Sequence, residues 1–247
     1  MCVLAFAWKM DPDWPLVLAG NRDERHDRPS APLHRWAEDP RIVAGQDLTA
    51  GGAWLGVSER GLLVTVTNVV AEGEHEEGRP SRGWLVRDLL LGRGDYAAPT
   101  PAMLDAFNPL NLLVFDRDEA RFWSNRPAPE VRALAAGVYG LSNAGLDQRG
   151  PRTDRLMAGL AAWMAEGSGR IEEPARLLAD SSIPDAGRGD DRENRPIFLR
   201  NPTWGTRCST VVRVSRDGRG EILERRYDAE GGEIGDSRFD FAWDARG

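Results

Sequence analysis

The sequence contains few of the residues that mark secreted, zinc-binding or membrane-spanning proteins. Its 247 residues include only two cysteines, Cys2 and Cys208, and three histidines. Two cysteines are too few for a disulfide-stabilised scaffold, and no Cys/His set has zinc-site spacing, so we expect no metal. No segment approaches the roughly 18 apolar residues that cross a bilayer, and the N-terminus carries no basic leader. We therefore expect a cytoplasmic protein without a transmembrane segment.

Lysine is scarce as well, and acidic residues outnumber basic ones. Lys9 is the only lysine, and 32 basic residues face 39 acidic ones, which gives a net charge of −7. A surface of this kind does not favour nucleic acid or anionic membranes as partners. No glycine-rich phosphate-binding pattern follows a predicted strand, so we expect no nucleotide cofactor. The length and the 41% hydrophobic content suit one large globular domain over residues 1–247.

Hydrophobic patterning predicts an antiparallel arrangement that begins with a hairpin. The apolar runs 2–8 and 16–20 flank a proline-containing turn. A loop centred there makes the numbers of paired residues sum to about 24, which sets Cys2 opposite Arg22. Residues 25–47 look like a long surface excursion, and 185–195 like a solvated loop. Further strands are predicted at 51–57, 62–68, 111–116, 120–125, 138–142, 208–215, 221–227 and 239–243, and helices at 81–91, 153–166 and 174–180.

Strands follow one another in hairpins at both ends of the chain, and helices group between them. Such segregation favours an α+β fold with antiparallel sheets and helical layers over a βαβ order.

Cys2 is the most informative residue. Removal of Met1 would leave a thiol and a free α-amine on the same residue. These groups ordinarily have pKa values of about 8.5 and about 8, so the amine can take the thiol proton without a histidine. By position alone, Cys2 is more simply a small apolar residue that opens a buried strand.

A polar cluster, residues 21–24, favours the catalytic interpretation. It ends an otherwise apolar strand and, by the hairpin count, faces the start of the chain. A carboxylate there could orient the amine of Cys2, while Arg22 would stabilise a thiolate. The alternative is a charged turn leaving the core, which suits Glu24 and Arg25 best.

Short motifs along nearly the whole chain resemble one family, the NRDE family, also called the Transport and Golgi organisation protein 2 family. The resemblance places this chain with the N-terminal-nucleophile hydrolases. It implies a four-layer αββα sandwich of two antiparallel sheets flanked by helices. The matching motifs are Met1–Cys2, Asn21–Glu24, Gly51–Gly56, Thr67–Asn68, Ser81–Gly83, Asn111–Leu113, Leu141–Asn143 and Gly205–Thr210.

The nearest catalytic relatives of this family, penicillin V acylases and bile salt hydrolases, cleave amides with an N-terminal cysteine. The resemblance implies Cys2 as nucleophile and Arg22 and Asp23 beside it, although their spacing departs from the R-N-x-D pattern of these relatives. It also implies Asn68 and Asn143 as oxyanion-side amides. As single residues, both would more simply be a turn and a strand-end asparagine. The remaining candidates are Arg207 as a late active-site arginine and Asn21, Trp54 and Trp204 as substrate-binding residues.

Two functions therefore stay open. The first is an N-terminal cysteine hydrolase that needs no cofactor and cleaves a non-peptide C–N bond in a small-molecule amide or acyl ligand. The alternative is a non-catalytic binding and trafficking protein for haem or a lipid or acyl ligand. Cys208 would lie near Cys2 if the sheet brings Arg207 to the site, and a disulfide is then an option. The sequence does not indicate an oligomeric state.

Overall fold

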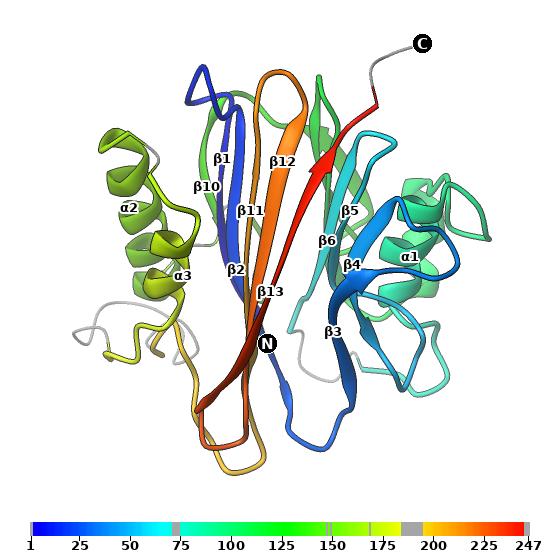
Figure 1. Cartoon of the computed structure of the whole chain (residues 1–247). Coiled ribbons are helices and arrows are strands. Elements are labelled where there is room, and N and C mark those ends of the chain that lie inside the picture. The colour runs from blue at the N-terminus through cyan, green and yellow to red at the C-terminus, as the bar shows by residue number, and fades with distance from the viewer. Residues whose placement is uncertain are drawn as a thin grey trace. The chain divides into compact units, whose positions relative to one another are not determined.

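A computed structural model describes residues 2–70, 75–146, 148, 150–167, 169–183 and 195–244. The chain forms two compact units, each with its own antiparallel sheet and helices (Figure 1). The first unit comprises Met1–Asp27 and Ala136–Phe241, and the second comprises Arg28–Ala135 and Ala242–Gly247. The assignment of residues 1–247 to a single domain stays a prediction.

The six-stranded sheet of the first unit places the N-terminal strand in its interior. Strand β1 pairs with β10 on one side and with β2 on the other, both antiparallel. Cys2 lies opposite Arg22 and Val3 opposite Asn21, so the predicted hairpin register is confirmed. The order across the sheet is β10 (Gly137–Leu141), β1 (Cys2–Trp8), β2 (Leu16–Arg25), β11 (Trp204–Val214), β12 (Arg219–Tyr227) and β13 (Glu233–Ala242).

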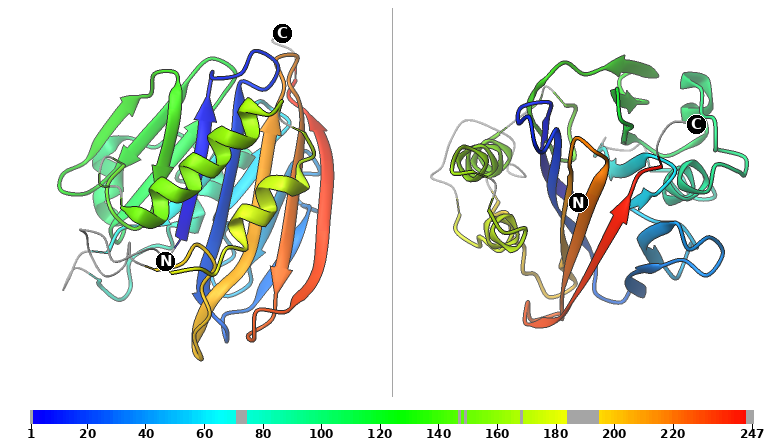
Figure 2. Two further views of the ribbon diagram at one scale, coloured as in Figure 1. Left: turned by 90° about the vertical axis from the view of Figure 1, so that its left-hand side faces the viewer. Right: turned by 45° about the horizontal axis from the view of Figure 1, so that its top comes forward.

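Helices α2 (Pro151–Ala165) and α3 (Glu172–Leu178) lie across one face of this sheet (Figure 2). Proline suits the first position of α2, and Leu156 and Leu160 recur at helical spacing on its buried side. They share a core with Val3 and with further odd-numbered apolar residues of β1, β2, β11 and β12. Gly140 allows this close approach, because a Cβ there would lie 2.2 Å from Thr153 Cγ2.

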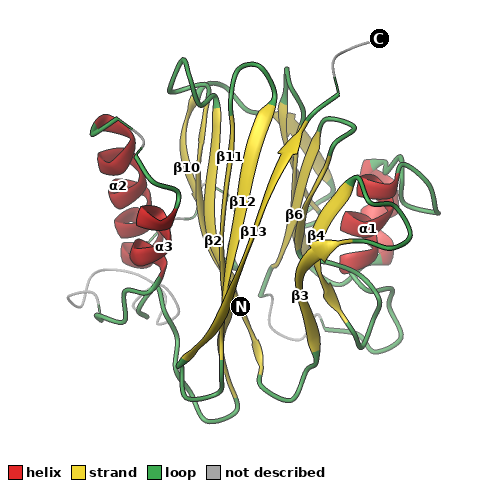
Figure 3. Cartoon of the chain, in the orientation of Figure 1, coloured by secondary structure: helices red, strands yellow, loops and turns green. Residues whose placement is uncertain are grey.

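The second unit is built around a seven-stranded antiparallel sheet, whose strands are yellow in Figure 3. Its core contains Leu85 and Leu90 of α1 (Gly83–Leu91), which packs on β4, β5 and β6. A 3₁₀ helix, η1 (Pro101–Ala106), packs on β8. The strand order is β3 (Ser30–Arg35), β4 (Ile42–Asp47), β5 (Leu55–Ser58), β6 (Leu62–Asn68), β7 (Leu110–Phe115), β8 (Ala120–Ser124) and β9 (Glu130–Ala133).

The prediction of a surface excursion over 25–47 is wrong. Strand β2 runs on to Arg25, and β3 and β4 lie within that range. β3 lies at the sheet edge and has one buried residue, Leu33, so its composition gave little hydrophobic signal, whereas Ile42, Val43 and Ala44 of β4 are fully buried. Most of the predicted loop over 185–195 lies outside the described residues. Across the described ranges, no helix is long and apolar enough to span a membrane.

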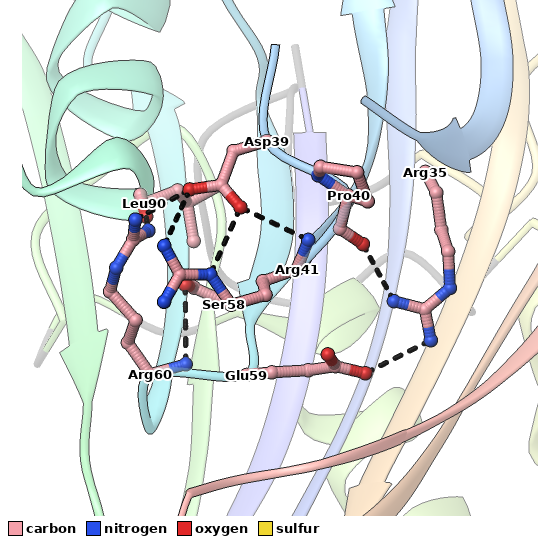
Figure 4. Close-up of polar contacts among 8 residues, drawn as sticks. All are labelled: Arg35, Asp39, Pro40, Arg41, Ser58, Glu59, Arg60 and Leu90. Atoms are coloured by element: carbon pink, nitrogen blue, oxygen red, sulfur yellow. Dashed lines mark hydrogen bonds and ion pairs between the residues drawn. The ribbon is translucent and has the colours of Figure 1, made fainter. Parts of the chain in front are cut away.

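Arginine–carboxylate contacts fix the loops of the second unit (Figure 4). Asp39 accepts hydrogen bonds from the backbone N and Nε of Arg41 and from Arg60. Arg60 also donates to the carbonyl of Leu90 at the end of α1, over 3.2 Å. The hydrogen bonds from Arg41, together with the Arg60 guanidinium, hold the pKa of the Asp39 carboxyl well below its ordinary value. This network joins the β3–β4 and β5–β6 connections to α1.

Candidate active site

Four residues form a continuous line across four neighbouring strands of the first unit, and we call them the Cys2 row. Cys2 pairs with Arg22, Arg22 pairs with Cys208, and Cys208 pairs with Arg226. Residues directly opposite in antiparallel strands project from the same face of a sheet. The odd-numbered neighbours pack under α2 and α3, so the Cys2 row lies on the other face.

Asn143 meets the start of the chain. It follows β10 by two residues and is buried, with 7% of its surface exposed. Leu141 pairs with Leu4, which brings the segment after β10 alongside the beginning of β1. The backbone nitrogen of Cys2 donates to Asn143 Oδ1 over 3.1 Å. In a chain without Met1 this nitrogen would be the α-amine, and a catalytic role for Asn143 stays a prediction.

Arg22 and Glu24 supply charge on the face of the Cys2 row. The Arg22 side chain is only 6% exposed, and its guanidinium lies 3.6 Å from the Glu24 carboxylate. Glu24 shares the face of Arg22 because alternate residues of a strand point the same way. Sequence reasoning left Glu24 out of the site as a turn residue. Combining the strand alternation with the Cys2–Arg22 register would have identified it.

Asn21 and Asp23 point to the helix side, so the four polar residues 21–24 do not share a face. Asn21 donates to the carbonyls of Leu178 and Ile197 over 2.8 and 3.0 Å and accepts from Ser209 over 2.6 Å. These buried hydrogen bonds tie β2 to the segments around α3. The expectation that the whole cluster faces the chain terminus is therefore corrected, and the role of Asn21 in substrate binding stays a prediction.

Asp23 forms a buried ion pair that the sequence did not predict. Its carboxylate accepts from Arg152 Nη2 over 2.7 Å and from Thr206 Oγ1 over 2.8 Å. The Arg152 and Asp23 side chains are 2% and 0% exposed. The only sequence signal was an arginine directly before the predicted helix 153–166, a position more often solvated. The pair connects α2, β2 and β11, and a catalytic role for Asp23 stays a prediction.

Arg207 occupies a β-bulge. The pairing of β11 with β2 shifts register between Thr206 and Cys208, which leaves Arg207 as the additional residue. Its Nη1 lies 3.2 Å from His26 Nδ1 and donates to the His26 carbonyl over 3.3 Å. Burial lowers the pKa of Arg207, and repulsion from Arg22 and Arg226 lowers it further.

The remaining predicted residues lie at other places. Trp204, at the start of β11, is half-buried under the guanidinium of Arg195, 5.6 Å from the ring centroid. Asn68 and Trp54 belong to the second unit. There Asn68 ends β6 opposite Leu110, and the Trp54 ring packs over Gly45 of β4. Their participation in the site of Cys2 stays a prediction.

The two thiols differ in environment and are not positioned to bond. Both Cys2 and Cys208 pair with Arg22, from opposite sides of β2, so their Cα atoms are two strand spacings or about 10 Å apart. A disulfide needs Cα atoms within about 7 Å, so the Cys2–Cys208 bond considered from the sequence is excluded without backbone movement. Burial and the neighbouring Glu224 raise the pKa of the Cys208 thiol well above its ordinary value. Cys2 is half-buried.

Metal-ligating side chains do not cluster in the described part of the chain. No group of three or more His, Cys, Asp or Glu residues there is arranged to hold an ion. The first unit brings together the half-buried thiol of Cys2, the Asn143 oxygen that accepts from the Cys2 nitrogen, and the buried guanidinium of Arg22 on the face of the Cys2 row.

Solved structures identify the class of fold. A Caenorhabditis elegans N-acylethanolamine-hydrolyzing acid amidase ortholog superposes with a TM-score of 0.51 at 14% identity, covering 85% of this chain and 92% of that chain. The C2A mutant of a conjugated bile acid hydrolase from Clostridium perfringens gives a TM-score of 0.50 at 12% identity, covering 97% and 92%. The chain therefore has an α+β fold of the αββα, N-terminal-nucleophile-hydrolase-like class.

Within this class, the family model described as Transport and Golgi organisation 2 matches residues 1–229, and the chain belongs to that family. A Transport and Golgi organization protein 2 homolog from Bos taurus is 31% identical over 266 residues, covering 91% of this chain and 92% of the bovine protein. The homologs from Mus musculus and Homo sapiens are each 29% identical with the same coverage. The resemblance noted in the sequence is confirmed.

Proposed function

We propose that this chain is an N-terminal cysteine amidohydrolase that cleaves a non-peptide C–N bond through a thioester on Cys2. The observation that carries the proposal is the 3.1 Å contact between the Cys2 nitrogen and Asn143 Oδ1. An N-terminal nucleophile needs its α-amine held in a fixed direction, because that amine is also its base. The hydrolase-like fold and the guanidinium groups beside Cys2 support the same chemistry.

Activation of the nucleophile begins with removal of Met1. The free α-amine takes the proton of the Cys2 thiol and leaves a thiolate. Arg22, directly opposite Cys2 and on the same face, favours the thiolate by Coulomb attraction. Asn143 Oδ1 accepts one N–H of the amine, which directs the nitrogen lone pair away from Asn143.

Acylation follows. The thiolate forms a C–S bond to the amide carbon, and the carbonyl electron pair moves to oxygen. Amide N–H donors stabilise such an oxyanion, and loss of one donor costs about 2.7–4 kcal/mol of transition-state stabilisation in related chemistry. The amide group of Asn143 is the donor we propose, and the oxyanion role of Asn68, which belongs to the second unit, stays a prediction. Collapse of the intermediate breaks the C–N bond, and the α-ammonium gives its proton to the departing amine.

Deacylation uses the same groups in reverse. The neutral α-amine takes a proton from water, and the hydroxide oxygen attacks the thioester carbon. The C–S bond then breaks, the acid leaves, and the thiol recovers its proton. Every proton moves between the amine, the sulfur, water and substrate, so no metal or cofactor enters the scheme. Free thiols suit the reducing cytoplasm in which we place the reaction.

The experiment pairs intact-mass analysis with turnover of a panel of small amides. We expect the purified chain to lack Met1, the wild type to release amine, and Cys2→Ala to release none while keeping the thermal unfolding midpoint. Cys208→Ala is the matched control and should keep turnover. Amide binding without amine release in the wild type would contradict hydrolysis and favour the acyl-ligand or haem-binding alternative, which stays a prediction.

A further inference from the structure

His26 directly follows β2 and binds two other parts of the first unit. Its backbone nitrogen donates to the Thr203 carbonyl over 3.1 Å, and its ring Nε2 lies 2.9 Å from the Asn201 carbonyl. Its ring Nδ1 lies 3.2 Å from Nη1 of Arg207, the bulge residue of β11. A side chain at Gly205 would crowd the ring, because a Cβ there would lie 3.3 Å from His26 Cε1. His26 therefore connects the end of β2 to the segment before β11 and to the bulge.

The partners of the His26 ring fix which nitrogen carries the proton. A carbonyl oxygen only accepts hydrogen bonds, and a guanidinium only donates them. Nε2 must therefore carry the hydrogen that faces Asn201, and Nδ1 must offer its lone pair to Arg207. The two contacts together require a neutral imidazole. A proton on Nδ1 would set a second donor and a second positive charge 3.2 Å from Arg207 Nη1, so this contact does not survive protonation of the ring.

The carboxylates near His26 belong to β2 and to the residue that follows His26. Glu24, on the same face as His26, lies 3.6 Å from the arginine that pairs with Cys2. Asp27 is exposed and accepts from Arg25 over 2.6 and 2.9 Å. The hydrogen bond from Arg25 does most to lower the pKa of Asp27, and attraction to His26 adds a smaller part. Each carboxylate has an arginine partner of its own, so the charge that faces Nδ1 is that of Arg207.

His26 also determines where the Arg207 guanidinium points. Strands β2 and β11 run side by side, and their pairing sets the backbone of Arg207 next to Cys208, which lies opposite Arg22 (Figure 1). His26 follows Arg22 by four residues, or roughly 13 Å along the strand. Arg207 Nη1 also donates to the His26 carbonyl, over 3.3 Å. The guanidinium is therefore directed along β2 and away from the Cys2 row, roughly 7–10 Å beyond it.

We propose that His26 is a positioning residue for Arg207: the neutral imidazole holds the guanidinium away from Cys2, and the protonated imidazole releases it. Within the described residues, both hydrogen bonds of the Arg207 guanidinium go to His26. Of the charged groups around it, Asp228 attracts Arg207 while Arg22 and Arg226 repel it. Histidine is the side chain whose charge changes most readily between about pH 5 and pH 8, so acidification is the signal to which this contact responds.

The catalytic consequence of the release rests on the proposed function. The backbone of Arg207 is next to the Cys2 row, so a guanidinium freed from His26 can turn back along β11 toward Cys2. A second positive charge near the thiolate favours its ionised form. Release of Arg207 in acid would thus support the nucleophile under conditions in which protons compete for its sulfur.

The test is a pair of crystal structures of the wild type, one at pH 8 and one at a pH where His26 is protonated. Nuclear magnetic resonance of protein labelled with nitrogen-15 histidine determines that second pH, and His26→Gln identifies the signal. We expect the contact between Arg207 and Nδ1 at pH 8 and its loss, with the guanidinium moved, in the acidic crystal. A contact absent at pH 8, a contact that persists beside a protonated ring, or a ring that stays neutral down to about pH 4.5 would each overturn the proposal.

His34 is the matched control in the same crystals. Its Nδ1 lies 2.7 Å from the Pro32 carbonyl, and because the ring donates in this contact, protonation leaves it intact. His26→Gln is the second control, since a glutamine amide can accept from Arg207 and donate to Asn201 at either pH. Arg207 should keep one position in both crystals of this variant. Movement of Arg207 between the two pH values in His26→Gln would assign its control to another group and overturn the proposal.

Hydrolysis of the amide panel supplies the catalytic readout. The ratio of wild-type kcat/KM to that of His26→Gln should rise at least about twofold from pH 8 to the acidic pH, the effect of one hydrogen bond. A merely structural role of His26 would leave this ratio constant and would overturn the positioning role. Release in the crystals with no amide hydrolysed would overturn the proposed function and leave the release standing. Hydrolysis with a fixed Arg207 would overturn the release and leave hydrolysis standing.

Discussion

The backbone nitrogen of Cys2 and the side-chain oxygen Oδ1 of Asn143 lie 3.1 Å apart, although 141 positions of the chain separate them. The contact depends on β10, which pairs with β1 along its whole length and ends just before Asn143. Asn143 is buried, so its amide is held in place by the fold before any ligand arrives.

Asn143→Ala should lower kcat about 10²–10³-fold, because it removes both the acceptor for the α-amine and a candidate oxyanion donor. Asn143→Asp keeps the acceptor and adds a negative charge, which favours the ammonium form and raises the pKa of the amine. The amine acts as a base only when neutral, so the acidic limb of the kcat/KM profile should move to higher pH by about one unit. An Asn143→Asp profile identical to the wild type would contradict the role assigned to Asn143.

The two cysteines should react at very different rates in the folded protein. Cys208 is 3% exposed and its raised pKa keeps the thiol protonated, whereas Cys2 is half-buried at the end of the chain. Iodoacetamide at pH 8 should label Cys2 at least about 100-fold faster than Cys208, and urea should abolish the difference. Peptide mass spectrometry measures both rates. Equal, slow labelling of the two thiols in the native protein would count against an accessible nucleophile.

Arg152→Gln should destabilise the fold by about 3–5 kcal/mol, since it leaves the buried Asp23 carboxylate without its charge partner. Arg155→Gln on the same helix is the control and should cost about 1 kcal/mol or less, because Arg155 pairs with Asp180 at the surface. Adding Asp23→Asn to Arg152→Gln should cost less than the sum of the single changes. Urea unfolding of the wild type, the three single variants and the double variant measures these costs. An Arg152→Gln cost equal to that of Arg155→Gln would show that the ion pair contributes little.

Asp39 should make stability fall in acid. Its pKa is lowered in the folded state, so the unfolded state binds more protons and the free energy of unfolding decreases as the pH falls below the ordinary carboxyl range. Asp39→Asn should therefore cost about 1 kcal/mol at pH 7 and progressively less below about pH 4. Glu77→Gln, at an exposed site, is the control. A cost of Asp39→Asn that does not change between pH 7 and pH 3 would contradict the assigned charge interactions.

Local patterning carried much of the fold. Apolar runs in the sequence predicted β1, the β1–β2 register and most later strands, because most buried strands consist of consecutive hydrophobic residues. Strand β9, which exposes three of its four residues, was missed, and β3 and the buried β4 were missed inside the range 25–47 predicted as a surface excursion. Strand pairing between distant segments, such as β2 with β11, has no local signal in a single sequence.

The sequence predicted which residues of the candidate site lie close together only where these residues belong to strands joined by a hairpin. Cys2 and Arg22 share a hairpin, so their proximity followed from counting residues. The separation of Arg22 from Asp23 onto opposite faces also follows from strand alternation and was overlooked. The Asp23–Arg152 ion pair and the position of Arg207 depend on the packing of α2 and on a bulge, which one sequence does not reveal.

Strands β1 and β2 lie inside a sheet that is completed only by β10 and β11, so this sheet cannot be completed until late in synthesis. Residues Arg28–Ala135 leave the ribosome as an uninterrupted stretch that supplies the whole seven-stranded sheet. The β1–β2 hairpin is synthesised first, but its free edges are covered only when Gly137–Leu141 pairs with β1 and Trp204–Val214 pairs with β2. Until then it presents unpaired backbone to other chains, the condition in which strands join intermolecularly. Truncations that remove the last third of the chain should therefore yield insoluble protein with a buried, unreactive N-terminus.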